Sequence, residues 1–373
     1  MRHCVLFAGG GTGGHLFPGI AVACELRRRH PEIEVVFAGA GRAVEGRAVA
    51  RAGFELERIR TRGLVGQSAA SLLQGLALLP VSMLDAAVLL RRRAPGLVVG
   101  LGGYSSGPIV LWAALCGRPT LLLEQNTVPG VTNRILARFV RGAAVSSAAA
   151  LPWFPGAGFV SGNPVRAGFF DAPAPERSPE RVHVLVVGGS QGAHAINAAM
   201  VAAAAGMAAG PRSLRVTHQA GARDVALVRE GYRAAGLPAR VEPFIEDLDR
   251  EMAVADLVVC RAGATTLAEL AAAGRPAVLV PFPHATHDHQ RHNAAAVAAA
   301  GGAEVIDERE LSGRTLGDRV VALAADDERR AALAAASRRL ARPAAARVIV
   351  DRMERLLALD AVSTRPARGG RSG

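Results

Sequence analysis

The strongest constraint on the fold is the opening stretch of the chain, where a short apolar run leads directly into a glycine-rich turn. Residues 5–8 are apolar, five of the six residues at 9–14 are glycine, and a helical pattern follows from Pro18. This order predicts a buried strand, a tight turn and the N-terminus of a helix. Such a turn lets a ligand approach the backbone, and the helix dipole favours an anion such as phosphate, although a glycine turn can also join a strand to a helix without binding anything.

A near-copy of this stretch lies halfway along the chain, at residues 184–194. In a gapless alignment, three of its glycines fall on glycines of the first turn, and His194 falls on His15. Two strand–turn–helix openings in one chain predict an α/β protein with two Rossmann-like, doubly wound domains that face each other across a cleft.

Strand and helix patterns alternate through both halves of the chain. Helices are expected near 45–52 and over a long apolar stretch at 70–92. The expected strands are 34–38, 55–60, 97–101 and 119–123 in the first half, and 182–187, 214–219, 239–244, 257–260, 277–280 and 303–306 in the second.

The expected organisation has four parts, and a Pro-rich lapse in the pattern after Gly162 marks the linker between the domains. They are an N-terminal, acceptor- and membrane-facing domain at 1–163, a second domain at 164–342, a helix at 343–363 that packs back towards the first domain, and a disordered tail at 364–373.

Composition narrows the class of protein. A length of 373 residues suffices for two hydrophobic cores. The net charge is +12, and the sequence contains arginine but no lysine. This charge permits a nucleic acid, anionic lipid or phosphorylated substrate as partner, but no nucleic-acid module is visible. The four cysteines form no CxxC pair, and we expect reduced core cysteines in a cytoplasmic protein without a secretory signal or membrane span.

The first turn also fits the dinucleotide fingerprint, with glycines at 9, 11 and 14. That fingerprint requires an acidic residue about 20 positions further on, where the second strand ends. Residues 37–41 contain no carboxylate, so a nicotinamide-dependent oxidoreductase is the weaker interpretation.

Short motifs occur along most of the chain: GGTGGH at 10–15, GGY at 102–104, EQN at 124–126, GNPVR at 162–166, GGSQGA at 188–193, CRAGATT at 260–266, Glu269, and PFPH at 281–284. Together they resemble the MurG family of bacterial N-acetylglucosaminyltransferases.

This resemblance implies a GT-B glycosyltransferase fold, with the lipid acceptor on the first domain and UDP-N-acetylglucosamine held mainly by the second. Ser190 would contact the diphosphate, Glu269 the ribose hydroxyls and Gln290 the sugar hydroxyls, while Arg166 and the backbone of Ile245 would hold the uracil. The other implied donor contacts are Thr12, Gly13, Gly14 and Asn126 in the first domain, and Ala264, Thr265, Thr266 and Leu267 in the second.

The resemblance also implies an inverting, single-displacement transfer to the muramoyl 4-hydroxyl of undecaprenyl-diphosphate-muramoyl-pentapeptide, lipid I to lipid II, in peptidoglycan synthesis. His15 is the candidate general base, because imidazole ionises near neutral pH; it could instead only cap the turn or position the acceptor. Glycine turns and helix N-termini can stabilise the leaving diphosphate, so no cofactor and no metal are expected. The residues expected on the acceptor and lipid side are Gly102, Gly103, Tyr104, Arg91, Arg92 and Arg93.

Two polar clusters could suggest a metal. His284, His287, His289 and His292 crowd one loop with Asp288, but no cysteine joins them, and this alternation also suits hydrogen bonding to sugars. The Asp247-Leu248-Asp249 stretch matches a bare DxD pattern but opens a helix, where acids complement the dipole.

Three positions depart from the family pattern: Leu123, where histidine is frequent, Ala262, where serine is frequent, and Thr266, where an apolar residue is usual. Two other functions remain open, a UDP-N-acetylglucosamine epimerase and a non-catalytic nucleotide-sugar-binding protein. The apolar-basic helix expected at 70–93 argues against an epimerase, which has no lipid substrate. We expect a peripheral protein on the cytoplasmic face of the cell membrane that meets the anionic leaflet and no nucleic acid; the sequence identifies no protein partner.

Overall fold

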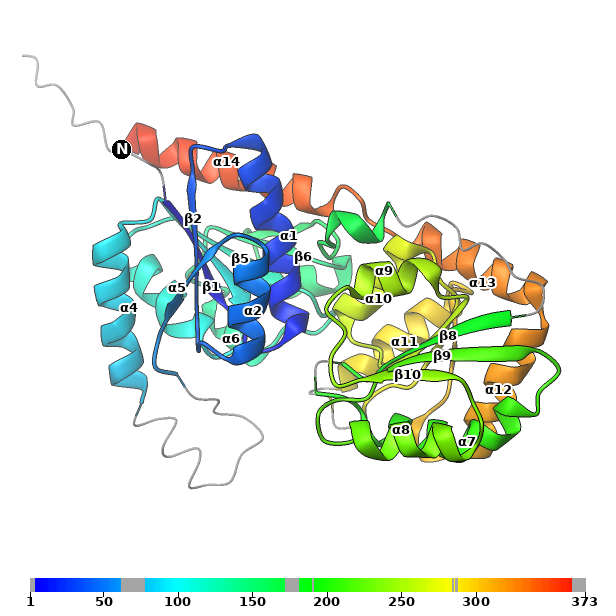
Figure 1. The fold of residues 1–373 in the computed structure, drawn as a ribbon. Coiled ribbons are helices and arrows are strands. Elements are labelled where there is room, and N and C mark those ends of the chain that lie inside the picture. Colours follow the sequence, from blue (N-terminus) through cyan, green and yellow to red (C-terminus); the bar gives the residue numbers. More distant parts are fainter. Residues whose placement is uncertain are drawn as a thin grey trace, which may run out of the picture. The chain divides into compact units, whose positions relative to one another are not determined.

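The computed structural model describes residues 4–61, 78–171, 181–189, 191–283, 285 and 288–363, with side chains up to residue 358. The chain forms two compact domains (Figure 1). The second domain is Val165–Pro343, and from Ala344 the chain returns to the first domain. The expected tail at 364–373 and residues 70–77 of the expected long helix lie outside the described residues.

The first domain is built on a seven-stranded parallel sheet with the strand order β3-β2-β1-β4-β5-β6-β7. The reversal of order beside β1 is the topological switch point, where open α/β sheets bind ligands beyond the carboxyl ends of their strands. The strands are β1 (Cys4–Gly9), β2 (Glu34–Gly39), β3 (Glu55–Arg58), β4 (Leu97–Gly102), β5 (Thr120–Glu124), β6 (Gly142–Val145) and β7 (Gly158–Val160).

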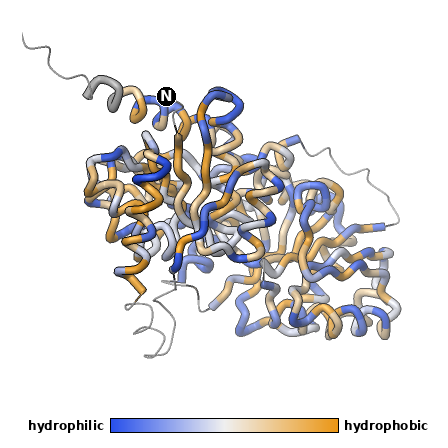
Figure 2. The backbone as a smooth tube through the Cα atoms, turned by 60° about the vertical axis from the view of Figure 1, so that its left-hand side comes forward, coloured by the Kyte–Doolittle hydropathy of each residue, from blue (hydrophilic) through white to orange (hydrophobic). Residues whose placement is uncertain are grey.

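Helices cover both faces of this sheet. The helices are α1 (Gly13–Arg29), α2 (Ala43–Arg51), α4 (Leu79–Arg93), α5 (Ser106–Leu115), α6 (Val131–Leu136) and α14 (Ala345–Ser363). Every residue of β1 and β4 is buried, which explains why the central strands are continuous apolar runs rather than alternating ones (Figure 2). Side chains of β1 alternate between two cores: Leu6 packs on the face with α4 and α5, and Phe7 on the face with α1 and α14.

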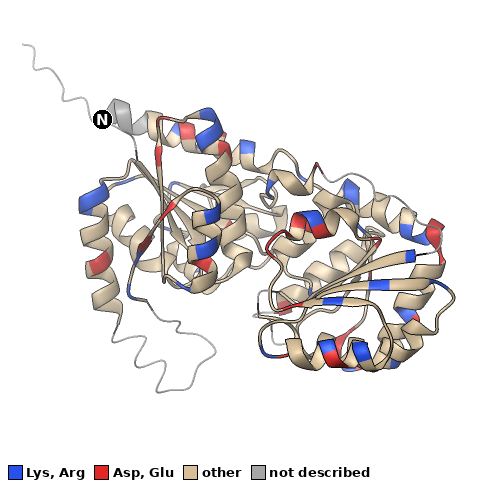
Figure 3. Ribbon diagram, in the orientation of Figure 1, with Lys and Arg blue, Asp and Glu red and all other residues tan. Residues whose placement is uncertain are grey.

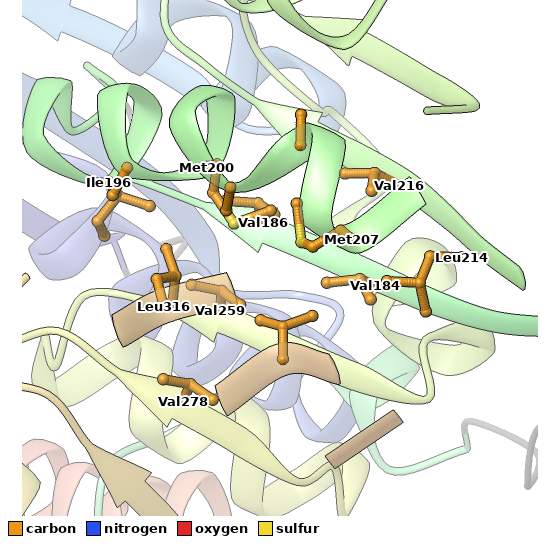
Figure 4. Close-up of a cluster of buried hydrophobic side chains, with 14 of the residues drawn as sticks. Val184, Val186, Ile196, Met200, Met207, Leu214, Val216, Val259, Val278 and Leu316 are labelled. Carbon is orange, nitrogen blue, oxygen red and sulfur yellow. The ribbon is translucent and has the colours of Figure 1, made fainter. Parts of the chain in front are cut away.

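The second domain repeats this plan with a six-stranded parallel sheet in the order β10-β9-β8-β11-β12-β13. One of its two buried cores lies between the sheet and α7, where Val186 and Val259 of the strands meet Ile196 and Met200 of the helix (Figure 4). Its strands are β8 (Arg181–Val187), β9 (Ser213–Gln219), β10 (Ala239–Glu242), β11 (Leu257–Cys260), β12 (Ala277–Leu279) and β13 (Ala303–Val305). Its helices are α7 (His194–Ala208), α8 (Val225–Ala234), α9 (Leu248–Val254), α10 (Ala264–Ala273), α11 (His289–Ala299), α12 (Gly313–Ala325) and α13 (Asp327–Arg339).

The last helix, α14, packs against α1 of the first domain. Ile349, Val350 and Met353 are fully buried in the core that contains Phe7. At the edge of this contact, Nη1 of Arg29 lies 2.6 Å from Asp351, and Nε2 of His30 lies 2.8 Å from Glu354. The hydrogen bond to Glu354 raises the pKa of His30.

The sequence analysis missed β6 and β7, which are short and follow one another at the edge of the first sheet. The helix expected at 70–92 is described from Leu79 onwards. In the part of the chain that the structure describes, no helix is long and apolar enough to cross a bilayer.

We predict that Met353→Ala destabilises the first domain by about 2–5 kcal/mol, because it opens a cavity in the core under α14. The chain contains two tryptophans, Trp112 and Trp153, and both lie in the first domain. Denaturant unfolding followed by tryptophan fluorescence therefore reports on this domain. Arg355→Ala, on the exposed side of the same helix, is the matched control and should leave the midpoint nearly unchanged.

Candidate active site

The first glycine turn joins β1 to α1 at the carboxyl edge of the first sheet. Gly9, Gly10 and Gly11 have φ values of +120°, +144° and +84°, a region that other residues rarely adopt. Thr12 is the N-cap of α1, and its carbonyl accepts the backbone N–H of His15 at 3.3 Å. His15 therefore lies in the first turn of the helix.

The GGY segment forms a second turn beside the first, because β4 is the neighbour of β1. A Cβ on Gly102 would lie 3.0 Å from Cδ2 and 3.4 Å from Nε2 of His15, so the imidazole packs directly against this turn. A Cβ on Gly103 would lie 3.1 Å from the carbonyl oxygen of Gly10. The structure therefore brings His15 together with both glycine turns, and the hydroxyl of Thr12 lies 3.3 Å from Nδ1 of the same imidazole.

The EQN segment follows β5 at the same edge. Burial raises the pKa of Glu124. The carboxylate also accepts hydrogen bonds, which lower the pKa, from the backbone N–H groups of Asn126 (2.9 Å) and Gly130 (3.1 Å) and from the side-chain amide of Asn133 (2.9 Å). Asn126 also donates its side-chain amide to Glu124 at 3.2 Å, so its amide oxygen is the group left to meet a ligand. Sequence reasoning gave Glu124 and Asn133 no role; Asn133 lies only 3.7 Å from the position of a Cβ on Gly102.

A third residue without a predicted role is Glu45 in the first turn of α2. Its side chain is 1% exposed, and its carboxylate accepts the backbone N–H of Gly11 and, at 2.9 Å, that of Arg42. An acidic residue in a helix's first turn looks like an ordinary capping group, so only the approach of β2 to β1 shows that it reaches the glycine turn.

The arginine triplet expected on the acceptor side does not lie with these turns. Arg91, Arg92 and Arg93 end α4 and precede β4 (Figure 3), so the six-residue strand, roughly 20 Å long, separates them from Gly102. Arg93 lies 3.0 Å from Glu34, and Arg92 lies 2.5 Å from Glu57. The triplet and the GGY turn therefore lie at opposite ends of β4, and the role expected for the triplet on the acceptor and lipid side stays a prediction. Tyr104, by contrast, lies at the turn and is 39% exposed.

In the second domain, the repeated glycine turn joins β8 to α7. Gln219 links this turn to the loop after β10, because its amide nitrogen donates to Gly189 at 2.7 Å and its amide oxygen accepts the N–H of Ile245 at 2.8 Å. The N–H of Ile245 is thus already engaged, and its carbonyl is the backbone group that could meet a ligand. Ser190 lies outside the described residues.

Helix α10 begins at Ala264, with Thr265, Thr266 and Leu267 in its first turn and Glu269 one turn further on. Glu269 is 5% exposed, and burial raises its pKa to about 7, against the opposing charge of Arg166. Nη2 of Arg166 lies 3.8 Å from the Glu269 carboxylate. The structure thus brings together two of the residues expected to bind the nucleoside.

Gln290 lies in the first turn of α11. Its amide oxygen accepts the N–H of Phe282 at 3.0 Å, which leaves its NH₂ group as the donor that could meet a hydroxyl. Among the described residues, no group of three or more His, Cys, Asp or Glu side chains could hold a metal ion; His284 and His287 are not among them. In the DxD stretch, α9 begins after Asp247 and carries Asp249 in its first turn.

Two parallel α/β domains with glycine turns at the carboxyl edges of their sheets are the architecture of GT-B glycosyltransferases. The family models for the N-terminal and C-terminal domains of glycosyltransferase family 28 match residues 5–145 and 183–350. The crystal structure of Acinetobacter baumannii MurG has a TM-score of 0.73 and 29% identity, covering 95% of this chain and all of that one.

Curated relatives extend over nearly the whole chain. A protein of Anaeromyxobacter sp. (strain Fw109-5) is 47% identical over 93% of this chain and 92% of its own length. One from Myxococcus xanthus (strain DK1622) is 45% identical over 93% of this chain and 91% of its own length. Both carry the name UDP-N-acetylglucosamine--N-acetylmuramyl-(pentapeptide) pyrophosphoryl-undecaprenol N-acetylglucosamine transferase. The chain belongs to glycosyltransferase family 28 and, within it, to the MurG family.

We predict that Glu269 makes the stability of the second domain depend on pH. Its folded pKa of about 7 exceeds the unfolded value of about 4.3, so its contribution is fully present below about pH 4 and is lost as the pH rises through about 7. Relative to Glu269→Gln, the wild type should lose on the order of 2–3 kcal/mol between pH 4 and pH 8, measured by calorimetry. The exposed Glu328→Gln variant is the control, and an identical pH dependence in all three proteins would contradict the assignment.

Proposed function

We propose that this protein transfers N-acetylglucosamine from UDP-N-acetylglucosamine to the muramoyl 4-hydroxyl of undecaprenyl-diphosphate-muramoyl-pentapeptide, the lipid I to lipid II step of peptidoglycan synthesis. The observation that carries this proposal is the relatives' similarity over nearly the whole chain, together with their names. The same names favour a transferase over an epimerase or a non-catalytic binding protein. Transfer of radiolabelled N-acetylglucosamine to a short-chain lipid acceptor tests it, and absence of labelled product would reject it.

The second domain would hold the donor. In its ionised form, Glu269 would accept hydrogen bonds from both ribose hydroxyls, and Arg166 with the carbonyl of Ile245 would meet the uracil. Ser190 and the first turn of α10, including Ala264 and Thr265, would face the diphosphate.

Sugar recognition would use the remaining polar groups. The NH₂ group of Gln290 would donate to a sugar hydroxyl oxygen, and Thr12, Gly13, Gly14 and Asn126 would contribute from the first domain. The acceptor would contact the turn formed by Gly102, Gly103 and Tyr104.

His15 would act as the general base in one inverting displacement. If Nδ1–H donates to the Thr12 hydroxyl, Nε2 is the unprotonated nitrogen of the imidazole and the one that would accept the proton. The 4-hydroxyl oxygen attacks the anomeric carbon and its proton passes to Nε2. The bond from that carbon to the diphosphate breaks, and its electron pair leaves with UDP. The N-termini of α7 and α10 would stabilise this charge without a metal.

We predict that His15→Gln lowers kcat by about 10²–10⁴-fold with little change in donor affinity, because loss of a general base acts on the transition state. Steady-state kinetics with a soluble acceptor and donor titration by calorimetry measure the two effects. His30→Gln, at the other end of α1, is the matched control. Turnover near that of the wild type would leave His15 with a positioning role only.

The lipid acceptor places the reaction at the membrane, and we propose peripheral binding to the anionic cytoplasmic leaflet. Besides the arginine triplet of α4, the first domain has a second basic surface that is a candidate for this contact. Arg134, Arg138 and Arg141 line a pocket of about 550 Å³, and Arg134 stacks on Trp153 at 4.5 Å. None of the described residues lining it is acidic, and the exposed Ile135 and Phe139 flank the arginines.

We predict that Arg134→Gln with Arg138→Gln releases the protein from vesicles containing anionic lipid, since each basic residue at such a surface contributes about 1 kcal/mol. Sedimentation at low salt measures the binding, and higher salt should weaken it. Arg91→Gln with Arg92→Gln is the comparison at the end of α4. Stronger release by this second pair would assign the membrane contact to the end of α4 instead. Wild-type protein that does not bind the vesicles would contradict membrane binding through either surface.

A further inference from the structure

Glu45 and Arg42 hold the first glycine turn from a neighbouring element that the proposed reaction does not use. The geometry points to these two residues as a positioning pair: they fix the Gly11 peptide groups, and through Gly11 they set the placement of Thr12 and His15. This inference rests on the proposed function, because His15 is the group whose placement matters.

The Glu45 carboxylate joins the glycine turn to the start of α2. One oxygen accepts the N–H of Gly11, and the other accepts the N–H of Arg42 at 2.9 Å. A Cβ on Gly10 would lie 2.9 Å from the first oxygen, and one on Gly39 would lie 3.3 Å from the second. The carboxylate is therefore enclosed between two backbone segments at which any side chain would crowd it.

Arg42 binds the carbonyl group of Gly11, the residue whose N–H is bound by Glu45. Its Nη1 donates to the carbonyl of Gly11 at 3.1 Å, so both the N–H and the C=O of Gly11 are engaged by the start of α2. A run of three glycines with positive φ has little conformational preference of its own, which makes such external contacts decisive for its shape.

The next residue transmits this placement to the candidate base. Thr12 follows Gly11 directly, caps α1 and approaches Nδ1 of His15 with its hydroxyl. A shift of Gly11 would move Thr12, and with it both the tautomer and the direction of the imidazole. Proton transfer and nucleophilic attack tolerate such shifts poorly, since a misplacement of about 1 Å can cost roughly 100-fold in rate.

The alternative to a positioning role is that Glu45 only caps α2 and stabilises the fold. Loss of a cap would lower stability and affect all kinetic constants through the amount of folded protein. A positioning role instead lowers kcat more than the other kinetic constants. It also makes the effect of changing Glu45 depend on the conformation of the glycine turn rather than on the stability of α2.

Glu45→Gln tests the proposal, because the amide keeps the volume but has one acceptor oxygen for two N–H donors. We expect kcat to fall roughly 10- to 100-fold. The dissociation constant of UDP-N-acetylglucosamine should change by a smaller factor, because Thr12 would move while the donor contacts proposed in the second domain would stay in place. Gly11→Ala strains the turn from the other side, and the double variant should be no slower than the worse single one. Glu55→Gln, an exposed carboxylate of the same domain, is the matched control.

A second readout does not depend on turnover. The imidazole Cε1–H resonance of His15, assigned with His15→Gln, should shift in Glu45→Gln and in Gly11→Ala but not in Glu55→Gln. If Glu45→Gln fails to fold, Arg42→Ala removes only the contact to the Gly11 carbonyl and should give the same effects with smaller size.

An unchanged kcat and an unmoved His15 resonance would overturn the proposal. So would a parallel fall in kcat, donor affinity and unfolding midpoint, which would make Glu45 a folding residue. If the wild type transfers no sugar, the proposed function fails, and the His15 resonance alone then decides whether Glu45 positions the turn.

Discussion

The direct approach of two backbone turns, with no side chain between them, is the constraint on which the first domain's site depends. A Cβ on Gly9 would lie 2.5 Å from the carbonyl of Gly102, and one on Gly103 would lie 3.1 Å from that of Gly10. This approach is possible because β1 and β4 are parallel neighbours whose carboxyl ends meet at one edge of the sheet. The imidazole of His15 packs against the Gly102 turn at this junction.

Buried carboxylates organise the segments around these turns in both domains. Glu45 holds the first glycine turn, Glu124 holds the loop that carries Asn126, and Glu269 lies beside Arg166 in the second domain. Burying a carboxylate is unfavourable unless hydrogen bonds or a cation compensate it, so each of them fixes its partners firmly. For Glu269, the effect of burial outweighs the charge of Arg166 and raises the pKa. In the proposed function, the ribose hydroxyls would donate hydrogen bonds to the ionised carboxylate.

Local patterns predicted the α/β class, most strands and the two glycine turns, because buried parallel strands are unbroken apolar runs that end at glycine. They missed β6 and β7, since four- and three-residue strands have too few residues to show a pattern. They did not show that Arg91–Arg93 and the GGY turn are separated, because closeness in sequence hides the fact that a strand's two ends lie at opposite edges. Glu45 was missed for a related reason: its contact with Gly11 joins residues 34 positions apart.

The central claim is that these elements serve one metal-independent, inverting transfer to a lipid-linked acceptor. The most direct test is to incubate the purified chain with UDP-N-acetylglucosamine and a short-chain lipid acceptor in excess chelator, and to determine the new linkage by NMR. The account predicts UDP and a β-(1→4)-linked disaccharide in equal amounts. A retained α-linkage, an epimerised free sugar, or activity restored only by added divalent metal would contradict it.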